Sequence, residues 1–153
     1  MKKRLFLLLL VLGFSSTAWG YCHVNVTANQ EICDGPITAT ATVCCCADCE
    51  FESVEYCRWG RVIYANVYLT CECVGGCEPL VLTEDDLEGA MGSELCCGPY
   101  ILVVRVWCTY ECWPYCMFGR PIFCGMGSTA FCVCSQECNC CPPCPGNCVT
   151  VAR

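Results

Sequence analysis

The chain has 153 residues, of which 23 are cysteine, and its formal net charge is −7 at pH 7. Eight residues are basic and fifteen are acidic, and no lysine follows residue 3. Because so acidic a chain repels the phosphates of nucleic acids and the surface of anionic membranes, we exclude nucleic acid as a partner.

The first twenty residues have the three-part pattern of a secretory signal peptide. A basic start at residues 2–4 precedes ten apolar residues from Leu5 to Phe14, and small residues follow at 15–18. A bilayer span needs ~20 apolar residues, and no later stretch is that long, so we expect no membrane span after leader cleavage. We predict cleavage after Gly20. The secreted chain then starts at Tyr21 with five arginines, fifteen acidic residues and a net charge of −10.

All 23 cysteines lie after residue 20, which is far above the ~8–10% that marks a disulfide scaffold in a secreted chain. Outside the cytoplasm thiols meet an oxidant, so disulfide pairing is the default. The odd number leaves at least one cysteine that is unpaired, metal-bound or bonded to another molecule. We therefore predict a disulfide-stabilised fold with sulfur left over for a further partner.

Apolar and polar residues alternate over Ile37–Val43, which predicts a strand with threonines on one face. Continued alternation places Cys45 on the apolar face and Cys44 and Cys46 on the other, so that these neighbours need different partners. The longer stretch 26–43, V-T-A-N-Q-E-I-C-D-G-P-I-T-A-T-A-T-V, resembles the first strands of bacterial immunoglobulin-like sandwiches. That resemblance implies an all-β fold.

Two longer strands follow. Val62–Val74 alternates with one apolar face and ends at the turn Gly75-Gly76. Tyr100–Cys108 is apolar on both faces apart from Arg105, which predicts a strand in the middle of a sheet. Shorter strands are predicted at 23–28, 120–124, 130–134 and 148–152.

One helix is predicted over T-E-D-D-L-E at 83–88, with Thr83 as its N-cap and acidic residues in its first turn. The fold class is therefore mainly β, a small disulfide-rich antiparallel sheet or sandwich with one short helix and a Cys/Pro-rich C-terminal segment. We predict three parts: a signal peptide at 1–20, a disulfide-rich β domain at 21–137 and a Cys/Pro-rich tail at 138–153.

The tail segment 138–148, C-N-C-C-P-P-C-P-G-N-C, combines Cys-x-Cys and Cys-x-x-Cys spacings that bring thiolates within reach of one soft ion such as Zn²⁺ or Cu(I). The spacings resemble those of metallothioneins. The chain departs from that family because it carries four Trp, seven Tyr and six Phe and has no lysine beyond its leader. We predict no metal and no other cofactor. If a metal site exists, its ligands come from Cys132, Cys134, Cys138, Cys140, Cys141, Cys144 and Cys148.

No catalytic constellation stands out. The single histidine, His23, adjoins Cys22, but adjacent side chains on a strand face opposite ways and cannot form a Cys–His pair. The Cys-x-x-Cys pairs 46/49 and 141/144 lack the strand-to-helix setting of a redox dithiol. We predict that the protein is not an enzyme.

These features predict a secreted or cell-surface structural protein, cross-linked to itself or to other extracellular proteins through intermolecular disulfides. The first alternative is a monomeric secreted binding module, toxin- or inhibitor-like, with Trp113, Tyr115, Met117 and Phe118 as its apolar anchors. The second alternative is a thiolate protein that binds Zn or Cu.

Overall fold

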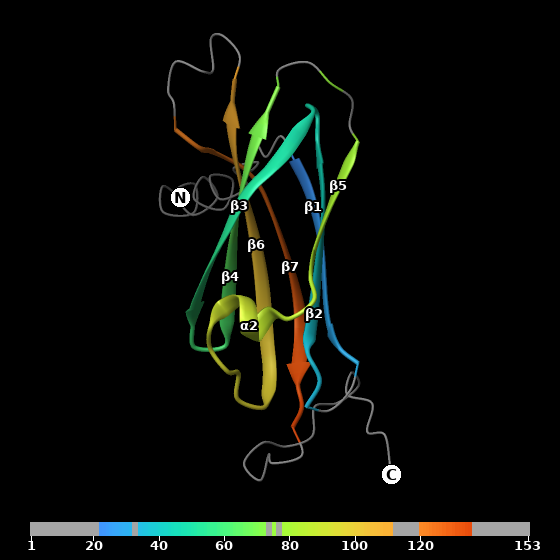
Figure 1. The fold of residues 1–153 in the computed structure, drawn as a ribbon, viewed down its shortest axis with the longest axis vertical. Helices are drawn as coiled ribbons and strands as arrows, with labels where there is room; N and C mark the ends of the chain where they lie inside the picture. The colour runs from blue at the N-terminus through green and yellow to red at the C-terminus, as the bar shows by residue number, and fades with distance from the viewer. Residues whose placement is uncertain (1–21, 32–33, 73–74, 76–77, 112–119, 136–153) are drawn as a thin grey trace, which may run out of the picture.

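A computed structural model of the chain describes residues 22–31, 34–72, 75, 78–111 and 120–135. This part is a sandwich of two β-sheets, elongated along its strands (Figure 1). The three-stranded sheet has the order β1 (Cys22–Gln30), β2 (Ile37–Cys45) and β5 (Pro79–Glu84). The four-stranded sheet has the order β3 (Cys49–Trp59), β4 (Val62–Cys71), β6 (Gly98–Tyr110) and β7 (Ile122–Val133). The predicted mainly β class is confirmed.

Neighbouring strands are antiparallel except for β4 and β6, which are parallel. The parallel pair has a simple cause. Between these two strands the chain crosses to the other sheet as β5 and returns through the helix α2 (Leu87–Met91), so β6 enters the sheet in the same direction as β4.

The predicted alternations of β2 and β4 are confirmed. In β2 the side chains from Ile37 to Cys45 alternate between buried and half-buried, with Cys45 in the core, Cys44 half-buried and Cys46 exposed. In β4 the buried face consists of Ile63, Ala65, Val67, Leu69 and Cys71.

Strand β6 lies between β4 and β7, as its two-sided apolar sequence predicts. Its inner face runs from Tyr100 to Cys108 and fills the centre of the core. It contributes Tyr100, Leu102, Val104, Val106 and Cys108.

The helix and β7 differ from the sequence-based expectations. The N-cap is Asp86, whose carboxylate accepts the Gly89 N–H at 3.1 Å, while Thr83 belongs to β5. The strands predicted at 120–124 and 130–134 are two ends of the single strand β7, because its middle is held in the sheet by backbone pairing to β6 and not by apolar side chains. No helix within the described ranges is long and apolar enough to cross a membrane.

Two strands went unpredicted, β3 and β5. Most side chains of β3 are exposed, so its sequence C-E-F-E-S-V-E-Y-C-R-W lacks a clear apolar face. Strand β5 ends at Glu84, inside the acidic run that resembles a helix start. The predicted signal peptide, the strand at 148–152 and the tail at 138–153 lie outside the described residues.

The two sheets meet backbone to backbone where β7 passes β1. A side chain at Gly125 would overlap the carbonyl oxygen of Cys22, and one at Gly127 would overlap that of Val24. Glycine is therefore needed at both positions, because only a residue without Cβ allows so close an approach. We call this contact the β1/β7 seam.

A buried glutamine secures one end of the seam. Gln30, at the end of β1, is 5% exposed. Its Nε2 donates to the Gly35 carbonyl at 2.8 Å, and its Oε1 accepts the Cys134 N–H at 2.7 Å, just beyond β7. The side chain thus satisfies its own polar atoms while it ties the two sheets together.

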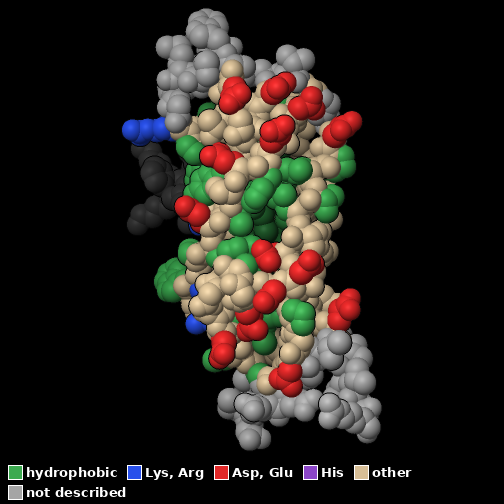
Figure 2. All heavy atoms as spheres, viewed as in Figure 1, with side chains coloured by type: hydrophobic (Ala, Val, Ile, Leu, Met, Phe, Trp, Pro, Cys, Tyr) green, Lys and Arg blue, Asp and Glu red, His purple; other side chains and the backbone are tan. Residues whose placement is uncertain are grey.

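The opposite side of the sandwich stays open. There the edge strands β3 and β5 stand apart, and Figure 2 shows a hollow lined with hydrophobic side chains between them, with carboxylates around it. The sandwich is therefore closed along one side and open along the other.

Replacement of Gly125 by alanine tests the seam. The added methyl must displace the backbone of β1, so Gly125→Ala is expected to lower the free energy of unfolding by about 1–3 kcal/mol. Guanidinium unfolding without reductant measures the change. The control is Ser128→Ala at an exposed position of the same strand, which is expected to leave stability within ~0.5 kcal/mol of the parent. Equal stability of the two variants would contradict the close approach.

Candidate functional site: a buried cluster of cysteine sulfurs

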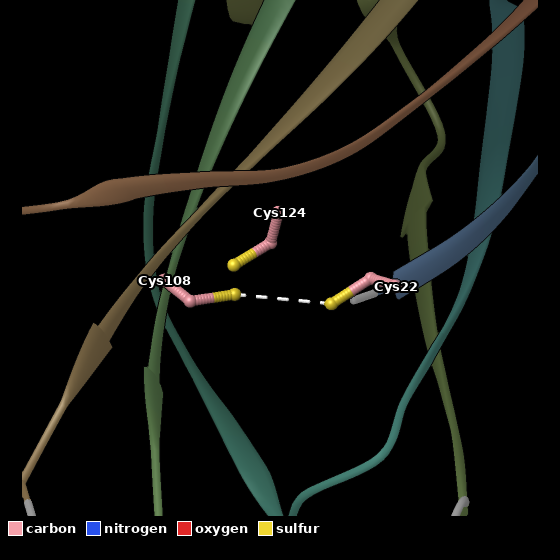
Figure 3. A group of neighbouring side chains, drawn as sticks. All are labelled: Cys22, Cys108 and Cys124. Atoms are coloured by element: carbon pink, nitrogen blue, oxygen red, sulfur yellow. Dashed lines mark hydrogen bonds between the residues drawn. The ribbon is translucent and has the colours of Figure 1, made fainter. Parts of the chain in front are cut away.

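Three cysteines from three strands meet inside the sandwich. Cys22 of β1, Cys108 of β6 and Cys124 of β7 are all buried, and their sulfur atoms lie within 4.8 Å of one another (Figure 3). The Sγ atoms of Cys22 and Cys108 are 3.9 Å apart, although 86 positions separate these residues in the sequence. We call this group the sulfur cluster.

Local structure explains how each sulfur reaches the cluster. Cys22 and Cys108 lie on the inward faces of alternating strands. Cys124 arrives differently, because the pairing of β6 with β7 shifts register between Val106 and Trp107. Val106 pairs with Gly125 and Trp107 with Phe123, which leaves Cys124 as the extra residue of a β-bulge. A bulge re-aims a side chain, and here it turns a thiol into the core.

One member of the cluster is half of a disulfide. Cys22 is bonded to Cys45, which lies directly opposite it in the β1–β2 pair. Cys49 and Cys71 form the same kind of cross-strand disulfide in the β3–β4 pair. Cys108 and Cys124 keep their thiols. The cluster therefore consists of one disulfide sulfur and two buried thiols.

Hydrogen bonding makes the two thiols unequal. Cys124 receives hydrogen bonds from Cys108 and from the hydroxyl of Tyr110, whose oxygen is 3.6 Å from the Cys124 sulfur. The bond from Cys108, assisted by that from Tyr110, lowers the pKa of Cys124 below the usual thiol value despite its burial. The same bond, together with burial, raises the pKa of Cys108. Cys124 is thus the member of the pair that ionises first.

The cluster does not fit a metal ion in this bonding state. A structural zinc site takes four ligands, and its sulfur ligands are thiolates. Only Cys108 and Cys124 offer thiols here, because the Cys22 sulfur is bonded to Cys45. The geometry suits thiol–disulfide exchange instead. If Cys108 passed its proton to the Cys124 thiolate and then attacked the Cys22 sulfur, a Cys22–Cys108 bond would form and Cys45 would leave as a thiolate, with no change in the number of disulfides.

The residues singled out in the sequence are placed as follows. His23 is exposed and Cys22 buried, so the two do not form a catalytic pair. Cys132 and Cys134 are disulfide-bonded, which removes both from the set of candidate metal thiolates. The other candidate ligands, Cys138, Cys140, Cys141, Cys144 and Cys148, lie outside the described residues, as do the anchors Trp113, Tyr115, Met117 and Phe118.

Sequence reasoning missed the sulfur cluster. The alternation of residues along its strand could have predicted that the side chain of Cys108 points into the core. The bulge that turns Cys124 inward has no comparable signal in the sequence. The approach of β1 to β7 could not be predicted from local sequence either, because the two strands are far apart in the chain.

The chain matches no protein-family model, no curated protein and no solved structure.

Removal of Cys45 tests the reach of the cluster. In Cys45→Ala the sulfur of Cys22 loses its partner but stays beside Cys108, so refolding with oxidised glutathione is expected to produce a Cys22–Cys108 disulfide. Peptide mapping by mass spectrometry identifies the bond. The control Cys44→Ala removes a half-buried thiol on the other face of β2 and is expected to leave the Cys22–Cys45 bond in place. An alkylatable Cys22 in Cys45→Ala would contradict the geometry.

Alkylation rates test the burial of the cluster. Iodoacetamide is expected to modify the exposed thiols of Cys57 and Cys96 in the native protein at once. Cys108 and Cys124 are expected to react only after guanidinium unfolds the sandwich, because the core excludes the reagent. Mass spectrometry of peptic peptides over time, with fragmentation to locate each modified cysteine, gives all four rates in one sample. Equal native rates for Cys124 and Cys57 would show that the core is open.

Proposed function

We propose that the protein is a secreted cysteine-rich structural or surface protein that is stabilised by internal disulfides and joined to its neighbours by further disulfides. The observation that carries the proposal is the division of its cysteines between core and surface. Internal bonds join Cys22 to Cys45 and Cys49 to Cys71, whereas Cys57 and Cys96 expose their thiols to solvent. Internal disulfides of this kind are consistent with an extracellular protein.

The surroundings of Cys57 favour contact with another protein. Cys57 lies on the edge strand β3, two residues before Trp59, whose side chain is 81% exposed. An exposed tryptophan is a frequent anchor in protein–protein contacts, and a thiol beside it can seal such a contact covalently. A structural protein of this type forms chains when each copy offers two thiols, and Cys57 and Cys96 meet that requirement.

The two alternatives make different demands. A monomeric binding module would present its loops and keep every exposed thiol unlinked. A thiolate metal protein would need many reduced cysteines, whereas seven described cysteines are disulfide-bonded: Cys22, Cys45, Cys49, Cys71, Cys97, Cys132 and Cys134. We therefore place the cross-linked structural role first.

Electrophoresis without reductant tests this role. The purified exported protein, incubated with oxidised glutathione, is expected to form a ladder of multimers that dithiothreitol collapses to a monomer. The double variant Cys57→Ser, Cys96→Ser is expected to lose most of the ladder, whereas Ser53→Ala, at an exposed position of β3, should keep it. A sharp monomer band from the parent protein would favour the monomeric binding module.

A further inference from the structure

The open side of the sandwich forms an apolar groove of about 460 Å³ between β3 and β5. Its floor includes Ala39 and Ala41 of β2 and Ala65 of β4, whose methyl groups are too short to fill the space between the sheets. Its walls include Val54 of β3 and Leu82 of β5. Figure 2 shows this hydrophobic hollow between the two edge strands. The groove therefore offers apolar surface that lies directly over the core.

Both walls of the groove are strand edges. Within the described part of the chain, β3 pairs with β4 alone and β5 pairs with β2 alone. Each therefore presents a row of backbone N–H and C=O groups without a ladder partner toward the opening. Apolar floor and open strand edges together fit an extended peptide, which binds by backbone pairing and buries every second side chain.

The charge at one end of the groove specifies the peptide further. A second hollow of about 380 Å³ lies at the start of β3 and β5 and is lined by five carboxylates: Asp48, Glu50, Glu72, Glu78 and Glu111. None of the described residues that line the two hollows is basic. Acidic side chains gathered in this way favour a cationic group on the bound peptide.

We infer that this groove binds residues 148–153 of a second copy of the chain, C-V-T-V-A-R, as an added strand antiparallel to β3. In this segment the apolar residues Val149 and Val151 alternate with Cys148, Thr150 and Ala152, and the last residue is the cation Arg153. At ~3.3 Å per residue it spans about 20 Å, close to the length of the six-residue wall β5. This inference deepens the proposed function, on which it rests, by naming the partner surface.

The register follows from the alternation of β3. Val54 and Tyr56 line the groove, whereas Cys57 is exposed on the other face of β3. Antiparallel pairing that places Val151 opposite Val54 and Val149 opposite Tyr56 also places Cys148 opposite Cys57. The same pairing brings Arg153 level with the β-bulge that follows Phe51, next to the carboxylate of Glu50.

A Cys57–Cys148 bond between copies would repeat a linkage that the fold already uses. Both disulfides Cys22–Cys45 and Cys49–Cys71 join residues directly opposite each other in antiparallel pairs. To form the new bond, two thiols lose two protons and two electrons to a small-molecule disulfide, which is released as two thiols.

Cys57 keeps its thiol in the single chain, which leaves it for a strand from another copy. Each copy then offers one groove and one strand. Contacts of this head-to-tail kind join many copies, in a closed ring or in an open chain.

Isotope mixing tests both the register and the second copy. Equal amounts of ¹⁴N and ¹⁵N protein are mixed, oxidised with glutathione disulfide and digested. The linked peptide Cys57–Cys148 is expected in four mass forms, two of them mixed. If the linked peptide appears in the two unmixed forms alone, each chain fills its own groove. If a ladder forms without any Cys57–Cys148 peptide, other cysteines join the copies. Either result overturns the inference, and the second leaves the proposed function intact.

Non-covalent docking is measured apart from the bond. The variant Cys57→Ser, Cys148→Ser is expected to self-associate in sedimentation experiments, and the further change Arg153→Glu is expected to weaken association about tenfold. The matched control Thr150→Ser alters an outward position and should leave association unchanged. Because Cys57 is exposed on β3 and the other changes lie outside the described residues, circular dichroism should match the parent. A variant that stays monomeric at every concentration, or that associates equally with Arg153→Glu, would overturn the docked strand.

Discussion

The close approach of β1 to β7 is the contact on which the rest of the sandwich depends. Gly125 and Gly127 allow the two backbones to meet, and the first residue of β1, Cys22, sits at that seam. Its carbonyl oxygen faces Gly125, and its sulfur is bonded to Cys45 and lies 3.9 Å from that of Cys108. Cys22 thus takes part in the seam, in the stapling of one sheet and in the sulfur cluster.

The disulfides Cys22–Cys45 and Cys49–Cys71 and the β1/β7 seam stabilise different parts of the sandwich. Cys22–Cys45 and Cys49–Cys71 each join neighbouring strands of one sheet, so neither bond holds one sheet against the other. Within the described residues, the apolar core, the seam and the hydrogen bonds of Gln30 hold the two sheets together. The seam closes one side of the sandwich only. The other side stays hollow because the alanine side chains of β2 and β4 are too short to fill it.

The distribution of sulfur connects this architecture to the proposed role. The disulfides Cys22–Cys45 and Cys49–Cys71 stabilise the sandwich, whereas Cys57 and Cys96 keep exposed thiols that the proposed role would use. The open edge strand that carries Cys57 also borders the apolar groove. The exposed thiol of Cys57 and the apolar groove thus belong to the same edge of the sandwich, which is the edge that the proposed assembly would use.

Much of the sheet structure could be predicted from local sequence. The alternation of Ile37–Cys45 and Val62–Cys71 and the two-sided apolar stretch around Val104 each specify a strand, because side chains alternate between core and solvent. The same rule placed Cys45 inside and Cys46 outside. Strand β3 could not be predicted in this way, since its mostly exposed residues satisfy backbone pairing without an apolar face.

The sequence by itself determined a mainly β, disulfide-rich chain and the facing of the residues in its regular strands, because both depend on composition and short-range periodicity. Only the tertiary structure decided the parallel pairing of β4 with β6, the seam at Gly125 and the meeting of Cys22, Cys108 and Cys124. These features join segments far apart in the chain, and one of them depends on a bulge that breaks the period of two. Long-range contacts of this kind depend on how the sheets pack, which the periodicity of short sequence segments cannot predict.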